Sequence, residues 1–328
     1  MLNYIGIDIS MQSLKLFDGK KEYEVPNERG LKNLEESLKV IYGKDWNNVL
    51  FIYEPTGPYS NFLKEFSLKH RIEVYEINPK KSSNFAKAIG NRSKTDSIDA
   101  KMLYSYHLLI REDKFKVPLI DPITEKLASF LRSYKLIQKM KTMLSNHIHS
   151  QKFVDKDNSV TNLSKFIEKE LERFSETEAK LEKKIENWVR NTDEIKEDFN
   201  NLLSIKGIGV ISAIVLLYMF RKYPDTNRAQ ITALCGLDPV KKESGNSVKG
   251  EKRISKAGNP LLRKILYFAC MNAIKHNDRI NLYYNRLINN RKPGKVALIA
   301  CMRKLVLIAH QIYVKKEKYR PLVINENI

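Results

Sequence analysis

Residues 4–9 read YIGIDI, a short apolar run with the carboxylate of Asp8 near its end. A run of this length and composition predicts a buried β-strand. Outward from it, turn residues and apolar spacing predict strands over 14–17 and 22–25, a helix over about 30–42, a strand over 49–53, a helix over 62–70 and a strand over 73–77. The N-terminal part of the chain therefore alternates strands and helices, as an α/β domain does.

Four carboxylates occupy informative places in this domain, whose order of three strands, a helix and strand–helix–strand is typical of an RNase H-like fold. Asp8 ends the first strand, Glu54 ends the fourth, and Asp96 and Asp99 are spaced to share one helix face. Such a set can hold two Mg²⁺ ions about 3.5–4 Å apart, with Mn²⁺ as a substitute. Taken singly, Asp8 could be a turn residue, Asp96 a helix N-cap and Asp99 a solvent-facing residue. The set of four favours a metal site.

The middle of the chain, from about residue 122 to 191, is long, polar and helical. Dense Glu and Lys with few helix breakers predict a coiled-coil hairpin. The two apolar stripes expected along it are Leu127, Leu131, Leu136, Met140 and Met143, and Leu163, Phe166, Leu171, Phe174, Leu181 and Ile185. Packing within one chain and self-association of two chains are equally open interpretations of these stripes.

The charge is strongly uneven along the chain. Lys and Arg number 58 against 38 Asp and Glu, a net of +20. Residues 1–110 contribute +2 (16 against 14), residues 111–240 contribute +3 (22 against 19), and residues 241–328 contribute +15 (20 against 5). Such an excess indicates a polyanionic partner. A basic solvated tail is the alternative, but Leu, Ile, Tyr and Ala at helical spacing indicate a folded segment.

Several other classes of protein are disfavoured. Cys235, Cys270 and Cys301 are far apart and form no CxxC pair, which argues against a zinc site or a disulfide framework and for buried thiols in a reducing compartment. The N-terminus lacks the pattern of a signal peptide, and no run of about 18 apolar residues predicts a transmembrane helix. We therefore expect a cytoplasmic protein without a membrane partner.

Two segments of the C-terminal half are predicted to contact phosphates. Gly207-Ile208-Gly209, between two apolar helices, resembles a helix-hairpin-helix turn, whose N–H groups approach phosphate. Residues 241–256 read as a flexible basic loop. The expected nucleic-acid contacts are Lys94, Gly207, Gly209, Lys241, Lys242, Lys249, Lys252, Arg253, Lys256 and Arg263. By local pattern alone, Ser244 in this loop is also a phosphate contact, Ser247 and Ser255 compete with it for any chemical role, and no base is evident.

Eight motifs carry a family resemblance that covers nearly the whole chain, in order. The N-terminal motifs resemble those of DEDD transposases of the insertion-sequence one-ten family: GID at 6–8, EPTGPY at 54–59, INP at 77–79 and KTDSIDA at 94–100. The C-terminal motifs resemble that family's transposase domain: LLSIKGIG at 202–209, ALCGLDP at 233–239, SGNSVKG at 244–250 and ISKAGNPLLRKILY at 254–267. Lys206 is a departure, since many relatives have proline there.

The resemblance implies a RuvC-like DEDD domain over 1–110, a coiled-coil linker over 111–195 and a C-terminal transposase domain over 196–328. The metal-binding tetrad falls on Asp8, Glu54, Asp96 and Asp99, and the serine nucleophile falls on Ser244. The implied partners are donor and target double-stranded DNA, a structured noncoding guide (bridge) RNA and further copies of the chain, as a dimer or tetramer, in the bacterial cytoplasm.

Three functions are consistent with these features. The leading hypothesis is a recombinase that forms a transient phosphoserine link to DNA. The alternative is a structure-selective endonuclease of the Holliday-junction resolvase type, in which water hydrolyses DNA and Ser244 only contacts a phosphate. A third hypothesis is a nucleic-acid-binding module with a relic acidic cluster, and retention of all four carboxylates argues against it.

Overall fold

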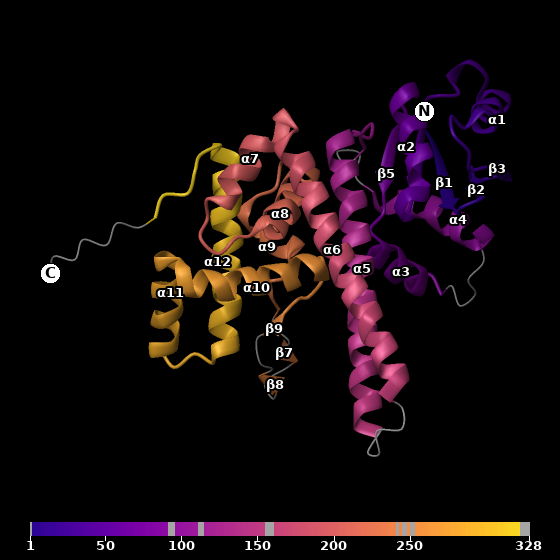
Figure 1. Cartoon of the computed structure of the whole chain (residues 1–328). Helices are drawn as coiled ribbons and strands as arrows, with labels where there is room; N and C mark the ends of the chain where they lie inside the picture. The colour runs from indigo at the N-terminus through magenta and orange to yellow at the C-terminus, as the bar shows by residue number, and fades with distance from the viewer. Residues whose placement is uncertain are drawn as a thin grey trace. The chain divides into compact units, whose positions relative to one another are not determined.

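The computed structural model describes residues 2–90, 96–110, 115–154, 161–240, 243–244, 248–249 and 253–321. Its contacts divide the chain into two compact units, Met1–Asp121 and Pro122–Ile328 (Figure 1). The first unit contains a mixed sheet with helices and the second is mostly helical. This is compatible with the expected RNase H-like domain followed by a helical region. The division at residues 110 and 195 stays a prediction.

The first unit is built on a five-stranded sheet with the strand order β3-β2-β1-β4-β5. The meander β1 (Asn3–Ile9), β2 (Ser13–Phe17) and β3 (Glu22–Pro26) is antiparallel, and β4 (Val49–Tyr53) and β5 (Glu73–Glu76) extend it parallel to β1. The helices are α1 (Lys32–Tyr42), α2 (Asn61–His70), α3 (Pro79–Ala88) and α4 (Asp96–Ser105), with short 3-10 turns at Gly43–Asp45, Gly57–Ser60 and Tyr106–Leu109. Every strand predicted in this unit is confirmed.

Both faces of the sheet are covered. One face packs Ile5, Ile7 and Tyr53 into a core with side chains of α1 and α2, including Leu34 and Leu63. The other face packs Leu50 and Ile52 against Met102, Leu103 and Tyr106, at α4 and the turn after it. A strand buried on both faces reads as a continuous apolar run, which explains the sequence VLFIY in β4.

The second unit is a helical assembly with two short β-pairs. Its helices are α5 (Pro122–Val154), α6 (Thr161–Arg190), α7 (Asp193–Leu203), α8 (Val210–Lys222), α9 (Arg228–Leu234), α10 (Pro260–His276), α11 (Asp278–Asn289) and α12 (Gly294–Lys315). Between α9 and α10, β6 (Pro239–Val240) pairs with β9 (Arg253–Ile254), and β7 (Glu243–Ser244) pairs with β8 (Val248–Lys249). Helix α8 is buried almost all round and forms the centre of the core.

Helices α5 and α6 lie side by side (Figure 1), and the two predicted apolar stripes are buried only in part. Leu136, Met140 and Met143 are 58%, 37% and 61% exposed, and Phe166 on α6 is 61% exposed. The other described members of the two stripes are buried or half-buried: Leu127, Leu131, Leu171, Phe174, Leu181 and Ile185. On α5 the buried side continues from Leu127 at seven-residue spacing through Tyr134, Lys141 and Ile148. The apolar stem of Lys141 lies in the seam while its ammonium bonds Glu178 on α6. The paired helices are present, and a coiled coil stays a prediction.

Helix α12 corrects one expectation. It is long and apolar enough to cross a membrane by length and composition, although half of that apolar window is buried inside the protein. Cys301, Leu305 and Ala309 pack in the core of the second unit. Its apolar composition is therefore explained by its place as a core helix, and like Cys301, Cys235 and Cys270 are buried free thiols.

Candidate active site

The pairing of β1 with β4 brings two of the predicted carboxylates to the same level of the sheet. Ile7 of β1 pairs with Tyr53 of β4 in parallel register. The next residues are Asp8, the second-last residue of β1, and Glu54, the first residue after β4, so both stand at the carboxyl ends of neighbouring parallel strands. Both residues are half-buried. Because side chains alternate along a strand, Asp8 falls on the face opposite Ile7, which is the face that α4 covers.

Helix α4 runs antiparallel to β1 and in direct contact with it. At the start of β1, the ring of Tyr4 stacks on that of His107 with centroids 4.6 Å apart. Two residues further along the strand, Gly6 meets the middle of the helix. A Cβ at Gly6 would lie 2.2 Å from the carbonyl oxygen of Ala100 and 2.3 Å from the amide nitrogen of Tyr104. Glycine is therefore required here for the close approach of helix to strand.

The antiparallel course of α4 carries its N-terminal end to the carboxyl end of β1, where Asp8 lies. Asp99 is in the first turns of this helix and is half-buried. It precedes Met102, Leu103 and Tyr106 by three, four and seven residues, and these three side chains pack on the sheet. Asp99 therefore lies on the sheet-facing side of α4. The structure thus brings Asp8, Glu54 and Asp99 to one edge of the sheet.

The described part of this edge does not contain a complete ligand set. Helix α4 begins at Asp96, whose side chain lies outside the described residues, as does Lys94. Among the side chains that the structure describes, no three His, Cys, Asp or Glu residues gather closely enough to hold a metal ion. The donors that are brought to this edge are carboxylate oxygens, which suit a hard divalent cation. Lys15 stands directly opposite Asp8 in the β1–β2 pair and adds positive charge to the same face.

Asn27 is a residue of this site that the sequence did not reveal. Its side-chain amide donates to the carbonyl oxygen of Ser10 at 2.7 Å and to that of Tyr59 at 3.0 Å. Ser10 follows the strand of Asp8, and Tyr59 lies in the loop that follows Glu54. Asn27 therefore ties together the segments that follow these two carboxylates. A lone asparagine after a strand reads as a turn residue, so no sequence signal pointed to it.

The second unit contains the segment with the predicted nucleophile. Ser244 lies in β7, and its backbone pairs with Val248 of β8. The side chains of Ser244 and Lys249 lie outside the described residues, and so do Lys241, Lys242 and Lys252. Val240 of β6 pairs with Arg253 of β9, so the two ends of this segment meet. We call residues 240–253 the serine ribbon.

Hydrogen bonds join the two family motifs that flank the serine ribbon, at the base where β6 pairs with β9. The hydroxyl of Ser255 donates to the carboxylate of Asp238. One guanidinium nitrogen of Arg263 donates to the carbonyl oxygens of Cys235 and Gly258, both at 3.1 Å. A Cβ at Gly258 would lie 2.1 Å from the carbonyl oxygen of Leu234. The motifs at 233–239 and 254–267 are therefore two halves of one tight junction, and Arg263 and Ser255 are engaged in it.

Of the remaining residues predicted to contact nucleic acid, one is packed against a helix and three are exposed. Gly207 has a positive φ of 104°, and a Cβ on it would lie 2.4 Å from that of Ala273 on α10. This glycine therefore serves packing of the turn against α10. Gly209 is exposed at the N-cap of α8, with open space around a Cβ. Arg253 and Lys256 are exposed beside the base of the ribbon.

Comparison with known proteins identifies the class and then the family. A DEDD transposase model, described as "Transposase", matches residues 5–152, and a model described as "Transposase IS116/IS110/IS902 family" matches residues 199–285. Together the two models span both units, and they define the class of protein as a DNA transposase or recombinase, an enzyme. The chain belongs to the IS110 family of transposases. The DEDD domain implies that a divalent metal ion is required.

Three relatives agree with this assignment. The pilin gene-inverting proteins of Moraxella bovis and Moraxella lacunata are each 24% identical over 324 residues, which cover 94% of this chain and 95% of the relative. The "Insertion element IS110 uncharacterized 43.6 kDa protein" of Streptomyces coelicolor is 32% identical over 113 residues, or 33% of this chain and 26% of the relative. The first two similarities extend across both units.

Proposed function

We propose that this transposase catalyses site-specific DNA recombination, using the carboxylates at the sheet edge and Ser244 as the nucleophile. The observation that carries the proposal is the register of the sheet. It sets Asp8 level with Glu54, and α4 runs back to the same edge with Asp99 on its inner face. Carboxylates that stand at one sheet edge, on two strand ends and a helix of one α/β domain, suit the binding of a metal ion and a phosphodiester once Asp96 completes the set.

The ion that fits this donor set is Mg²⁺, with Mn²⁺ as a substitute, because hard cations prefer oxygen ligands. Asp8, Glu54, Asp96 and Asp99 would hold it. When bound, it supplies positive charge to the scissile phosphate. The carboxylates fix where that phosphate lies, and Lys15, opposite Asp8, adds a positive charge at the same face.

The chemistry proposed for Ser244 is transesterification. A bond forms between its Oγ and the phosphorus of the scissile phosphodiester while the bond from phosphorus to the leaving strand breaks. The serine proton ends on the leaving oxygen, which becomes a free hydroxyl. The reverse reaction with the hydroxyl of a different strand releases Ser244 and rejoins DNA without net hydrolysis. Basic side chains near the ribbon, such as Arg253 and Lys256, would stabilise the charge on phosphorus.

The partners proposed are donor and target DNA, a structured noncoding guide RNA and further copies of the chain. The excess of basic residues in 241–328 supports the binding of both DNA and RNA, whose phosphates it would neutralise. The names of the Moraxella relatives describe inversion of a gene, a reaction in which cut strands are rejoined. This supports recombination over the hydrolytic endonuclease alternative, which the comparisons do not favour. A cytoplasmic, DNA-associated location follows from action on DNA.

The test is recombination between a donor and a target plasmid, with the noncoding RNA that flanks the gene supplied or omitted. We expect recombinant product only with the RNA, and none with Asp8→Asn or Glu54→Gln, both of which should still bind DNA. Each of these changes removes a charged oxygen ligand and little else. Wild-type product from both variants would contradict the carboxylate site, and equal product without RNA would contradict guidance.

A further inference from the structure

The outer face of α10 carries large apolar side chains that the fold leaves exposed. Tyr267, Phe268 and Met271 are 40%, 59% and 43% exposed. Lys264 and Lys275 stand at the two ends of the same face. Lys264 precedes Tyr267 and Phe268 by three and four residues, and Lys275 follows Met271 by four, so the five side chains share one side of the helix. The opposite face of the helix, with buried residues that include Leu266 and Ala273, already fills the core. We call the five exposed residues the α10 stripe.

The two rings of the stripe are arranged to offer flat apolar surface to a ligand. The centroids of Tyr267 and Phe268 are 5.5 Å apart with the ring planes at 90°, so the rings support each other edge to face. Nucleic-acid bases stack on exposed aromatic rings, and cations beside the rings attract the backbone phosphates. Lys264 and Lys275 are 11 residues apart, about 16 Å along a helix, which is the scale of a few nucleotides.

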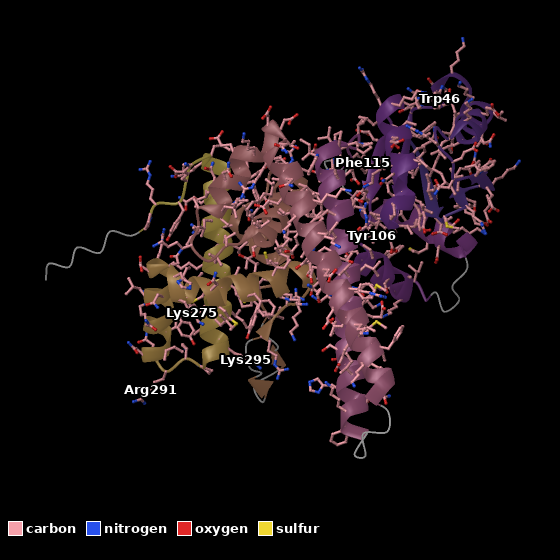
Figure 2. The ribbon with its side chains drawn as sticks, viewed as in Figure 1. Trp46, Tyr106, Phe115, Lys275, Arg291 and Lys295 are labelled. Carbon is pink, nitrogen blue, oxygen red and sulfur yellow. The ribbon has the colours of Figure 1, made fainter. Side chains whose placement is uncertain are left out.

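Charge identifies the kind of occupant. Residues 253–321 contain 16 Lys and Arg against two acidic residues, Asp278 and Glu317. Figure 2 labels three of these cations, Lys275 on α10 and Arg291 and Lys295 near the α11–α12 turn. Within the described part of the chain, no carboxylate forms an ion pair with Lys264 or Lys275. Lys264 donates to the amide oxygen of Gln138 at 2.9 Å, and an ammonium has further donors for a phosphate. A nucleic acid has both properties that the stripe suits, negative phosphates for the lysines and flat bases for the aromatic rings.

The stripe is held at a fixed place relative to β9, which follows the segment of Ser244 in the chain. Strand β9 leads into α10 through residues 255–259, which the bonds of Ser255 and Arg263 pin to residues 235–238. A DNA strand bound to α10 would therefore lie next to the junction from which β6 and β9 lead to the segment of Ser244. We propose that the α10 stripe binds unpaired DNA beside the cleaved phosphate, with bases stacked on Tyr267 and Phe268 and phosphates at Lys264 and Lys275. The inference rests on the proposed function, in which DNA is cleaved by Ser244 and its strands separate near the cut.

The test measures binding of a 12-nucleotide single-stranded DNA, its duplex and an RNA of the same sequence to the full-length protein, by fluorescence anisotropy. Tyr267→Leu and Phe268→Leu keep apolar bulk but remove the aromatic face. We expect each to weaken single-stranded DNA binding about tenfold or more, in line with the value of one stacked base, and to leave duplex binding unchanged. Phe268→Trp should retain affinity. Tyr223→Leu is the matched control, because Tyr223 is 39% exposed and is the C-cap residue of α8, outside α10.

Three results would overturn the proposal. Unchanged single-stranded DNA binding in both leucine variants would show that no base stacks there. A loss confined to RNA would assign the stripe to RNA. A change in oligomeric state on light scattering, with DNA binding intact, would assign it to a second copy of the chain. The proposed function is tested separately, because Ser244→Ala should abolish recombination without changing single-stranded DNA affinity.

Discussion

At the scale of single residues, the geometry of the carboxylate edge depends on two side chains that are uncharged. Gly6 allows α4 to lie directly on β1, and Asn27 joins the loops that follow Asp8 and Glu54. Neither residue touches the proposed metal ion. Both act by fixing where the carboxylates stand, as outer residues of metal sites commonly do.

Gly6→Ala should disable the enzyme by displacing α4. The new methyl group would meet backbone atoms of Ala100 and Tyr104 at 2.2 and 2.3 Å, so the helix must move and Asp99 with it. Overpacking of this kind costs about 1–3 kcal/mol, so we expect a lower melting temperature and loss of recombination. Gly294→Ala is the control, since among the described residues a Cβ there would meet one atom within 4 Å, the Tyr284 hydroxyl oxygen at 3.7 Å. Full activity in Gly6→Ala would contradict the role assigned to α4.

Asn27→Ala should weaken metal binding about tenfold or more, because outer partners of metal ligands contribute on that order. Titration of Mn²⁺ by calorimetry measures this without reference to catalysis. DNA binding in the absence of metal should be unchanged. Asn33→Ala removes a nearby exposed asparagine whose side chain, among the described residues, donates to Glu28 at 3.4 Å, and should leave Mn²⁺ affinity as it was. Equal affinity in both variants would make Asn27 a purely structural residue.

The sequence pattern pointed to the carboxylates but not to Gly6 and Asn27, the residues that position them. Asp8 and Glu54 each end an apolar strand, which is a local pattern. The importance of Gly6 depends on a helix about a hundred residues further along the chain, and that of Asn27 depends on two loops. The complete tetrad and Ser244 stay predictions, because the side chains of Asp96 and Ser244 lie outside the described residues.

At the scale of elements, the pairing of α5 with α6 depends on a buried polar cluster. Glu178 is 8% exposed and accepts hydrogen bonds from Gln138 and, at 2.5 Å, from Lys141. Burial acts to raise the pKa of Glu178, but the hydrogen bonds from Lys141 and Gln138 outweigh it and hold the pKa below its ordinary value of 4.5. Lys264 of α10 bonds the same Gln138, so the cluster also ties the pair to the rest of the second unit.

This cluster predicts a defined pH dependence of stability. A carboxyl group whose pKa is lower in the folded protein stabilises the fold above its unfolded pKa, and this contribution is lost as pH falls through the folded value. Glu178→Gln should therefore lower the melting temperature at pH 7, and the difference from wild type should shrink below about pH 4.5. Glu176→Gln is the control, since Glu176 is exposed and 3.8 Å from Lys180. A difference that is constant with pH would contradict this role.

The same cluster explains why the sequence predicted these helices but only part of their contact surface. The apolar periodicity of Leu136, Met140 and Met143 pointed to one face, but all three are exposed. The real seam passes through Tyr134 and Lys141, polar residues that pack along their stems and bond at their tips. Apolar spacing alone cannot detect a seam position filled by a paired lysine.

At the scale of the whole molecule, the dominant feature is the division of charge. Residues 1–110 are nearly balanced at +2, and residues 241–328 carry +15. The proposed carboxylate site therefore lies in a nearly neutral part of the chain, and Ser244 lies in the strongly basic part. Composition alone predicted this division, since net charge requires no knowledge of contacts. The boundary between the units depends on contacts, and the structure sets it at Asp121–Pro122.

Nucleic-acid binding should therefore be steeply dependent on salt and governed by the C-terminal segment. Each phosphate neutralised on duplex DNA contributes about −0.9 to the slope of log affinity against log salt. Reversing Lys249, Lys252 and Arg253 together to Glu should flatten that slope by about two to three. Reversing Lys20, Lys21 and Lys32 of the first unit is the control and should leave it nearly unchanged. Equal slopes for both triple variants would place the binding surface elsewhere.

The central claim is that DNA becomes linked to Ser244 during the reaction, and the most direct measurement is the capture of that link. Wild-type enzyme, guide RNA and a labelled DNA substrate nicked to prevent rejoining are separated on a denaturing gel. We predict a labelled protein–DNA band that vanishes in Ser244→Ala and persists in Ser247→Ala and Ser255→Ala. Loss of the attacking oxygen should reduce recombination by orders of magnitude, beyond the effect of one lost hydrogen bond. No covalent band in wild type, together with metal-dependent cutting of branched DNA by Ser244→Ala, would contradict the claim.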